Sequence, residues 1–311
     1  MPSGDLTLLD GQAYGSNLIK KGVIETLVSE SPVLEMLPFL PIAGNALEVT
    51  VEDSLPAPQF RNVNEGYTTS KGSDTKRFYG VAILGGEVFI DNFIIKVQAN
   101  KVGVKARQYA KFAKAMSQTF DKSFFDGTGT AKDFMGINAL IDAGLGQSVD
   151  GLDQTVKLEK LDEAFDLLRV TSDPDAILLN RTIRRQITTL GRNVSGHSLI
   201  DVGSDVFGRQ VTQYNGTPMR IMGDDIAGDA LLGFDESTGG DTLVASLYII
   251  KFGTEENVSG LSGAGGSMEV QDFGETEAAP GHLGRVEWYP GLAIYNSFSV
   301  VRYFSIDADV D

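Results

Sequence analysis

Residues 101–125 constrain the possible fold of this chain more than any other stretch. Their apolar side chains recur at steps of three or four residues, a spacing that places them on one face of an α-helix. This apolar stripe consists of Val102, Ala106, Tyr109, Ala113, Met116, Phe120 and Phe124. At about 1.5 Å per residue the helix would be roughly 37 Å long, beyond the usual three to four turns. It is either a long amphipathic core helix or a spine on which sheets from both ends of the chain pack.

The composition is that of a folded protein with a sizeable core. The chain has 311 residues, enough for one large domain or two modest ones. It contains no cysteine, which excludes disulfides, thiolate metal sites and a cysteine nucleophile. Residues 1–10 lack the basic and apolar blocks of a signal peptide. No run approaches the roughly 20 apolar residues of a membrane span.

The charge is strongly negative overall but positive along the predicted helix. A net charge of −16 argues against a chain whose whole surface binds nucleic acid. Between residues 96 and 122, however, every charged residue except Asp121 is basic. These basic residues are Lys96, Lys101, Lys105, Arg107, Lys111, Lys114 and Lys122. A solvated helix face is the ordinary explanation of such a run, and a surface that faces an anionic partner is the alternative.

The N-terminal part predicts a helix followed by an apolar arm. Residues 14–29 have a helical pattern whose buried positions would be Leu18, Val23, Leu27 and Val28. Residues 31–41 contain three prolines, which forbid a continuing helix and favour an extended chain. Such an arm has too few partners of its own to offset the cost of ordering it. We therefore expect it to lie against another surface, either its own or a neighbour's.

Two strands separated by a long polar segment predict a projecting hairpin. Residues 46–53 alternate between apolar and polar side chains, and a second strand is predicted over residues 79–90. Residues 54–76 between them are rich in Pro, Gly, Ser, Thr, Asn and charged residues. A connection of this length is uncommon in a compact domain, and an isolated two-stranded hairpin is marginally stable in water. We therefore expect another chain to cover it.

After residue 150 helices and strands alternate, which predicts an α/β subdomain over roughly 150–260. Its predicted helices are residues 158–168 and 181–191, and its predicted strands are residues 175–179, 219–222 and 247–250. A glycine-rich flexible loop is predicted over residues 257–267, with Gly260, Gly263, Gly265 and Gly266. Two aromatic and β-branched strands, residues 286–295 and 298–306, should return to the first domain.

The sequence contains no convincing catalytic or metal-binding constellation. His197 and His282 are too few for a zinc site without cysteine, and the stretch around His197 only partly matches a nucleophile elbow. The glycine-rich residues 126–137 lack the Walker spacing of a phosphate-binding loop. Three carboxylate pairs suggest solvated turns or, alternatively, a weak divalent-cation site: Asp224-Asp225, Asp235-Glu236 and Glu255-Glu256. We predict no catalytic, cofactor-binding or metal-binding residues and no cofactor.

The order of these elements resembles the major capsid proteins of tailed bacteriophages, which have the HK97-type fold. Local resemblance lies in residues 78–92, 124–137 and 175–185. The resemblance implies an α+β fold with an N-terminal arm, an extended β-hairpin loop, a long spine helix, a peripheral domain and an inserted axial domain. The implied boundaries are 1–45 for the arm, 46–91 for the hairpin, 92–151 and 271–311 for the peripheral domain with its spine at 101–125, and 152–270 for the axial domain.

The resemblance also implies a function and a set of partners. Such subunits form hexamers and pentamers that close an icosahedral shell around double-stranded DNA, in a virion assembled in the host cytoplasm. Each extended loop lies over a neighbouring subunit, each arm reaches across another, and the loop at Gly260–Gly266 would gather near the capsomer centre. Further implied partners are a portal and a scaffolding or decoration protein, and no membrane. Some members form covalent cross-links through a loop lysine, and Lys71 and Lys76 lie in that region, but no cross-linking chemistry is assigned here.

Two alternatives stay open. An encapsulin-type protein compartment has the same fold but encloses an enzyme cargo, and a monomeric α/β hydrolase or binding protein belongs to another class. The basic spine carries a hypothesis of its own: Lys105, Lys111 and Lys114 would face packaged DNA or an acidic patch of a neighbouring subunit.

Overall fold

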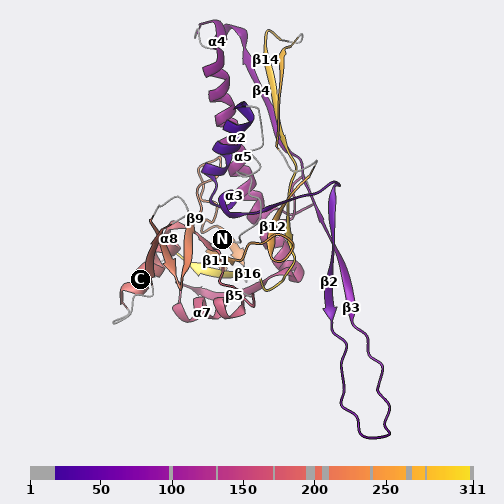
Figure 1. Cartoon of the computed structure of the whole chain (residues 1–311). Helices are drawn as coiled ribbons and strands as arrows, with labels where there is room; N and C mark the ends of the chain where they lie inside the picture. Colours follow the sequence, from indigo (N-terminus) through magenta and orange to yellow (C-terminus); the bar gives the residue numbers. More distant parts are fainter. Residues whose placement is uncertain are drawn as a thin grey trace.

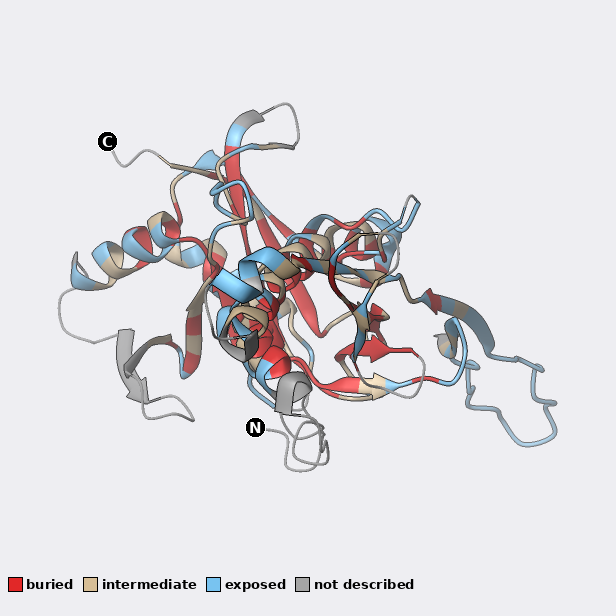
Figure 2. Cartoon of the chain, turned by 90° about the horizontal axis from the view of Figure 1, so that it is seen from above, coloured by how far each residue is buried: buried red, intermediate tan, exposed pale blue. Residues whose placement is uncertain are grey.

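The structure is a computed structural model that describes residues 18–97, 101–130, 132–170, 172–193, 200–204, 210–238, 241–263, 268–276 and 279–308. Figure 1 shows three parts: a sheet-containing body, a column of helix and strand that rises from it, and a two-stranded hairpin that projects away from it. Buried residues concentrate in the centre of the molecule, and the outer hairpin is exposed (Figure 2).

The column is built on the long helix α5 (Lys101–Asp126). Its buried apolar residues are Tyr109, Ala113, Met116, Phe120, Phe124 and Phe125, whereas Ala106 is exposed. Helix α2 (Leu18–Glu30) packs along it with Val23, Leu27 and Val28 buried. A three-stranded sheet adjoins α5, formed by β13 (Glu269–Glu275), β14 (Gly281–Trp288) and β4 (Leu84–Asp91). Because β4 precedes α5 and β14 comes late in the chain, the spine interpretation is confirmed.

Two glycines let this sheet approach the helix closely. A Cβ atom on Gly86 would lie 2.9 Å from the ring of Phe112, and one on Gly284 would overlap the hydroxyl of Tyr109. A larger residue at either position would push β4 or β14 away from α5. The sheet and the spine therefore form one packed unit.

The prediction of an extended arm is wrong for residues 32–36, which are helical, and the described part of the arm lies against its own subunit, one of the two surfaces that the sequence left open. Residues 32–36 form a helical turn, α3 (Pro32–Met36), in which Pro32 stands in the first turn, where its missing N–H costs nothing. The short strand β1 (Phe39–Pro41) then pairs in parallel with β12 (Val258–Ser262). The ring of Phe39 lies 5.4 Å from that of Trp288 and 6.2 Å from that of Phe120, centroid to centroid. This part of the arm is therefore core, and residues 1–17 lie outside the described ranges.

The flexible loop predicted over residues 257–267 is also wrong over its first half. Residues 258–262 form β12, a fully buried strand between β1 and β15 (Pro290–Ile294). A Cβ atom on Gly260 would lie 2.6 Å from Cδ1 of Phe39. The glycine therefore makes room for the aromatic ring and does not mark a flexible loop. This sheet lies beside the spine and not in the α/β subdomain, which removes the basis for placing Gly260 near a capsomer centre.

The substitution Gly260→Ala should lower the free energy of unfolding by about 1–3 kcal/mol, because it overpacks a fixed ring. Phe39 cannot yield easily, since it is held between Trp288 and Phe120. Urea unfolding of unassembled subunits measures the effect. Gly22→Ala is the matched control: Gly22 is exposed on α2 with nothing within 4 Å of an added Cβ, so the substitution should be neutral or stabilising. Equal midpoints for Gly260→Ala and wild type would contradict the prediction.

The body contains an eight-stranded sheet with its own buried core. Its strands in spatial order are β5 (Gln147–Gln154), β16 (Val300–Asp307), β11 (Asp241–Ile250), β6 (Ala176–Leu179), β9 (Thr217–Ile221), β8 (Gln210–Tyr214) and β7 (Ile200–Ser204), with β10 (Glu236–Thr238) paired to β11. Helices α7 (Leu158–Leu167) and α8 (Arg181–Asn193) pack on it through buried Leu161, Ile183 and Ile187. The predicted helices and strands of this region are confirmed.

Strand β16 differs from its predicted place. It lies between β11 and β5, in antiparallel register with the first and parallel with the second. The last strand therefore completes the sheet of the body rather than returning to the sheet beside the spine, as the boundary 271–311 had implied. The physical reason is burial on both faces: Val300 joins one hydrophobic core, and Val301 and Tyr303 on the other face join the second.

Candidate assembly surfaces

The hairpin consists of β2 (Ala46–Ser54) and β3 (Ser73–Gly80), paired from Ala46 with Gly80 to Ser54 with Ser73. The predicted second strand over residues 79–90 is wrong as one element: it is divided between β3 and β4, and β4 belongs to the column. The base of the hairpin is anchored to the body, because the buried Tyr79 donates a hydrogen bond from its hydroxyl to the carbonyl of Ile294. The paired strands extend the chain outward from that anchor.

The loop between the two strands, residues 55–72, is exposed throughout. It carries four large apolar side chains that face solvent: Leu55, Phe60, Val63 and Tyr67. Phe60 is fully exposed, with a relative accessibility of 108%. Removing such side chains from water is favourable by about 25 cal/mol per Å². The described part of the chain therefore leaves these apolar side chains in water, and a complex with a partner that covered them would be stabilised by their burial.

Hydrogen bonds within the loop give its tip a defined shape. The backbone N–H of Asn62 donates to Oε2 of Glu65 at 2.9 Å, and Arg61 donates to the carbonyl of Glu65 at 3.2 Å. These bonds from Asn62 hold the pKa of Glu65 below its usual value. The guanidinium of Arg61 also lies 5.0 Å from the ring centroid of Tyr67. A tip with a preferred conformation has a lower ordering cost when it binds a partner.

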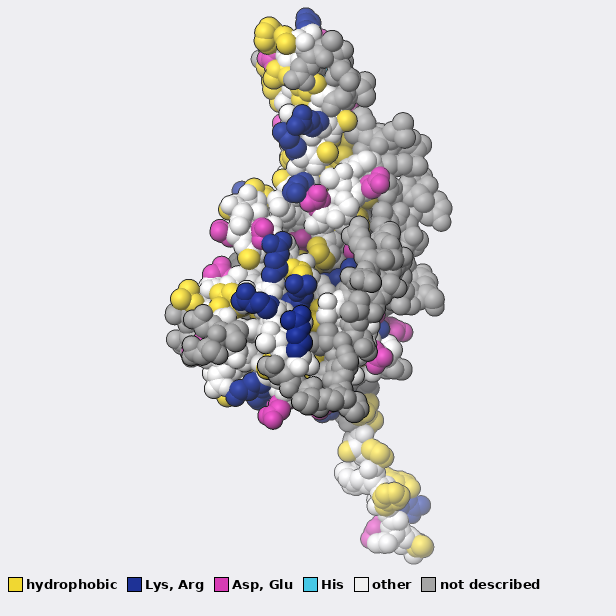
Figure 3. Space-filling model, turned by 90° about the vertical axis from the view of Figure 1, so that its left-hand side faces the viewer, with side chains coloured by type: hydrophobic (Ala, Val, Ile, Leu, Met, Phe, Trp, Pro, Cys, Tyr) yellow, Lys and Arg dark blue, Asp and Glu magenta, His cyan; other side chains and the backbone are white. Residues whose placement is uncertain are grey.

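A second apolar surface lies at the outer end of the column. The short helix α4 (Asn92–Val97) exposes Phe93, Ile94 and Val97, and the neighbouring strands expose Phe89 and Phe273. Figure 3 shows hydrophobic side chains gathered at this end of the molecule. Clusters of this kind on soluble proteins mark contact sites.

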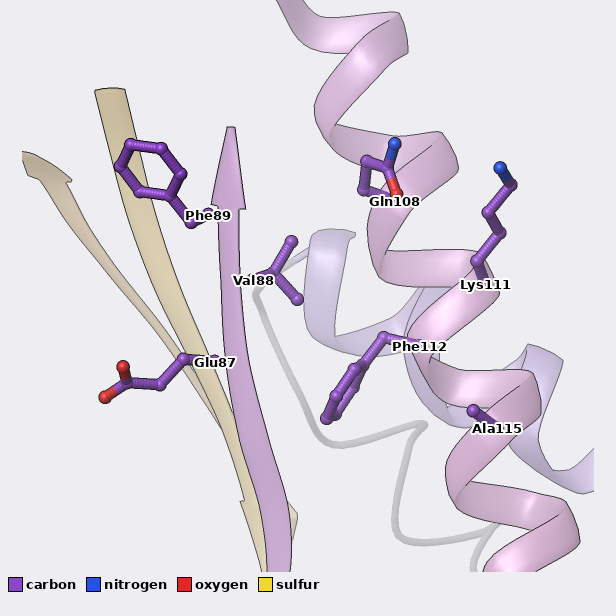
Figure 4. A pocket seen from close by; sticks show the side chains of 7 residues that line it. All are labelled: Glu87, Val88, Phe89, Gln108, Lys111, Phe112 and Ala115. Carbon is purple, nitrogen blue, oxygen red and sulfur yellow. The ribbon is translucent and has the colours of Figure 1, made fainter. Parts of the chain in front are cut away.

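A groove lies between α5 and β4 (Figure 4). Its volume is about 360 Å³, and its lining consists of Glu87, Val88, Phe89, Gln108, Lys111, Phe112 and Ala115. In Figure 4, Val88 and Phe112 point toward each other across the gap, while Lys111 extends outward from the helix. The groove is apolar where strand and helix meet and carries opposite charges at its rim, which suits a side chain of a partner rather than catalysis.

The spine carries much of its predicted positive charge in ion pairs with its own chain. Nζ of Lys105 lies 2.7 Å from Asp272, Nζ of Lys114 lies 2.9 Å from Glu30, and Nζ of Lys122 lies 3.1 Å from Asp225. The hydrogen bond from Lys105 and the ion pair offset burial and hold the pKa of Asp272 below its usual value. Lys111 makes no ion pair with the described residues. The spine is therefore a weaker anion-binding surface than the sequence suggested.

One acidic residue of the spine is buried beneath the arm. Asp121 is 2% exposed and accepts a hydrogen bond from the hydroxyl of Ser31, which is itself 1% exposed. The same hydroxyl accepts the backbone N–H of Leu34 and so caps α3. Burial raises the pKa of Asp121 to about 8. Its carboxyl is therefore protonated at neutral pH, which explains how an acid is tolerated between the arm and the spine.

Two of the predicted carboxylate pairs each contain a residue with structural partners. Asp225 accepts the N–H groups of Ala227 and Asp229 and pairs with Lys122, and Oε2 of Glu236 lies 2.8 Å from Arg302. His282 is buried in β14, and His197 lies outside the described residues. Across the described ranges, no group of three or more His, Asp or Glu residues is arranged to hold a metal ion. None of the helices in those ranges combines the length and apolar character needed to cross a membrane.

A family model described as Major capsid protein GP7 matches residues 16–150. That range contains α2, the arm, the hairpin, the spine and the first half of β5. No curated protein sequence matches the chain significantly.

Solved structures resemble the fold over nearly the whole chain. The SrpI encapsulin complex from Synechococcus elongatus PCC 7942 has a TM-score of 0.65 at 14% identity, covering 91% of this chain and 90% of that one. A chain of Microbacterium phage Oxtober96 has a TM-score of 0.62 at 16% identity, covering 88% and 90%. The capsid of an empty GTA particle, computed with C5 symmetry, has a TM-score of 0.60 at 10% identity, covering 89% and 90%.

These comparisons confirm the α+β fold of the HK97 type and the resemblance to phage major capsid proteins. The matched family and structures are those of shell-forming proteins and not of enzymes.

Proposed function

We propose that this chain is the major capsid protein of a tailed bacteriophage, many copies of which close a shell around double-stranded DNA. The observation that carries the proposal is the hairpin: an anchored, internally bonded projection whose loop exposes Leu55, Phe60, Val63 and Tyr67 to solvent. A monomer gains nothing from that arrangement. A closed assembly of identical subunits supplies every hairpin with a covering neighbour, because each copy offers the same receiving surface.

The apolar end of the column supports the same proposal. It lies at the opposite end of the subunit from the hairpin loop (Figure 1), so one subunit has two separate contact surfaces. Contacts between two different surfaces generate rings when the rotation from one subunit to the next closes. We infer that the rings are hexamers and pentamers of an icosahedral shell assembled in the host cytoplasm, with a portal and a scaffolding or decoration protein as further partners.

Self-assembly of the purified protein tests the proposal. We expect size-exclusion chromatography to give a large particle and electron microscopy to show closed shells of uniform size. Particles recovered from an infected host should contain nuclease-protected double-stranded DNA. A stable monomer at micromolar concentration would contradict the proposal and would favour a monomeric α/β binding protein or hydrolase instead.

An encapsulin-type compartment is the second candidate, and the structural similarity to the SrpI encapsulin favours it. The family model described as a major capsid protein favours the first candidate. The contents of the particle separate the two: an enclosed enzyme without nucleic acid would support the compartment, and enclosed DNA would support the capsid.

A further inference from the structure

The helix α8 presents a row of arginines to solvent. Its exposed face carries Arg181, Arg184, Arg185 and Arg192, and the helix contains no acidic residue. Its opposite face is buried through Ile183, Gln186 and Ile187. Figure 3 faces the side on which α8 lies in Figure 1, and Lys and Arg side chains gather in the middle of that face. The chain has a net charge of −16, whereas the exposed face of α8 is positively charged.

The helix is held in one position by buried polar contacts. Oδ1 of Asn180 accepts the N–H of Ile183 at 2.8 Å, and its Nδ2 donates to the carbonyl of Leu232 at 2.8 Å. Gln186 accepts the N–H of Val156 and donates to the carbonyl of Asp307. The arginine row is therefore presented on a rigid element rather than on a loop.

None of these four arginines forms an ion pair within the described part of the chain. The ion pairs found there involve other basic residues, including the spine residues Lys105, Lys114 and Lys122. Like charges one turn apart on a helix destabilise it. An anionic partner would remove that cost, and none of the acidic residues in the described ranges is paired with these arginines.

Resting on the proposed function, we propose that α8 binds the phosphate backbone of the enclosed double-stranded DNA. From Arg181 to Arg192 the row spans about 16 Å at 1.5 Å per residue. A strand of duplex DNA places roughly five phosphates over that length. Guanidinium groups bind phosphates in a bidentate manner. A straight row of this kind fits a rod-like polyanion better than a small anion.

The surroundings of the row favour DNA over an acidic surface of another copy. Protein interfaces have an apolar core, and the exposed residues of α8 in the described range are arginines and Thr189, with no exposed large hydrophobic side chain. Phosphate contacts need no apolar core, because released counterions supply the affinity. The contact should therefore be independent of DNA sequence and sensitive to salt.

Binding of a 40-base-pair DNA duplex to unassembled subunits, in which α8 is accessible, tests the proposal when it is measured by fluorescence anisotropy over a series of NaCl concentrations. The variant is R181Q/R184Q/R185Q. The matched control is K132Q/K157Q/R169Q, which removes the same charge at exposed positions outside the hairpin loop and α8. We expect the α8 variant to lose at least tenfold in affinity and to reduce the salt slope by about three. The control should change affinity less than threefold.

Thermal unfolding and electron microscopy of both variants complete the test. Equal losses in the two variants, or no loss in the α8 variant, would overturn the proposal. Failure of the α8 variant to form shells while it keeps its DNA affinity would overturn it in favour of a contact between copies. If wild-type protein binds DNA through α8 but forms no shells, the capsid function fails and the DNA site stands. If wild-type protein forms shells but its unassembled subunits do not bind DNA, the DNA site fails and the shell-forming function stands.

Discussion

Replacing residues 55–72 with the dipeptide Asn-Gly should abolish shell formation and leave the subunit folded. Ser54 and Ser73 are paired across β2 and β3, so a two-residue turn can join them without changing the register. The replacement removes Leu55, Phe60, Val63 and Tyr67 from the loop but keeps the anchor at Tyr79. No buried residue is lost. The thermal midpoint of the subunit should therefore remain within a few degrees of the wild type, while electron microscopy shows no closed particles.

A single substitution gives a graded form of the same test. Phe60→Ser should remove most of the contribution of one fully exposed aromatic ring, on the order of 2 kcal/mol per contact. Because each shell repeats the contact many times, the concentration needed for assembly should rise at least tenfold. Thr68→Ala, an exposed polar change in the same loop, is the control and should assemble like the wild type. Wild-type shell yields from both Phe60→Ser and the shortened hairpin would show that the loop makes no essential contact.

The spine and the α/β subdomain were predictable because their signals are local. The stripe on α5 and the apolar pattern of α7 each follow from side-chain spacing within one element. The alternation of residues 46–53 likewise located β2. The exposed loop of the hairpin followed from its composition. These are the elements that position the candidate assembly surfaces.

The errors arose where distant residues decide the outcome. Gly260 indicates a loop until Phe39, which is far away in the sequence, is known to lie against it. The arm has the proline content of an extended segment, yet the hydroxyl of Ser31 caps α3 and also donates a hydrogen bond to Asp121 on the spine. The basic run on α5 loses its apparent role because Asp272 and Asp225 come from other elements. The arginines of α8 were overlooked because the sequence does not show which basic residues form ion pairs. In the fold three lysines of the spine are paired, and the arginines of α8 are not paired with described residues.

Asp121→Asn should stabilise the subunit at pH 8, by an amount on the order of 5 kcal/mol. Asp121 is buried against Ser31, and burial raises its pKa from 3.8 to about 8. The folded state therefore keeps a proton that the unfolded state releases above pH 4. As the pH rises from about 4 to about 8, the free energy of unfolding falls, and it levels off once the folded state also ionises. Asparagine has the shape of the protonated acid and cannot ionise, so it removes this fall.

Urea unfolding of unassembled subunits between pH 4 and pH 9 measures the effect. The wild type should lose stability steadily across this window, and Asp121→Asn should follow a flatter curve that meets the wild type near pH 4. Asp166→Asn is the matched control, because Asp166 is exposed on α7 and should leave the pH dependence unchanged. Parallel curves for wild type and Asp121→Asn would mean that Asp121 is ionised in the folded subunit. An ionised Asp121 would require water or a cation beside Ser31. The contact between the arm and the spine would then be accessible to solvent.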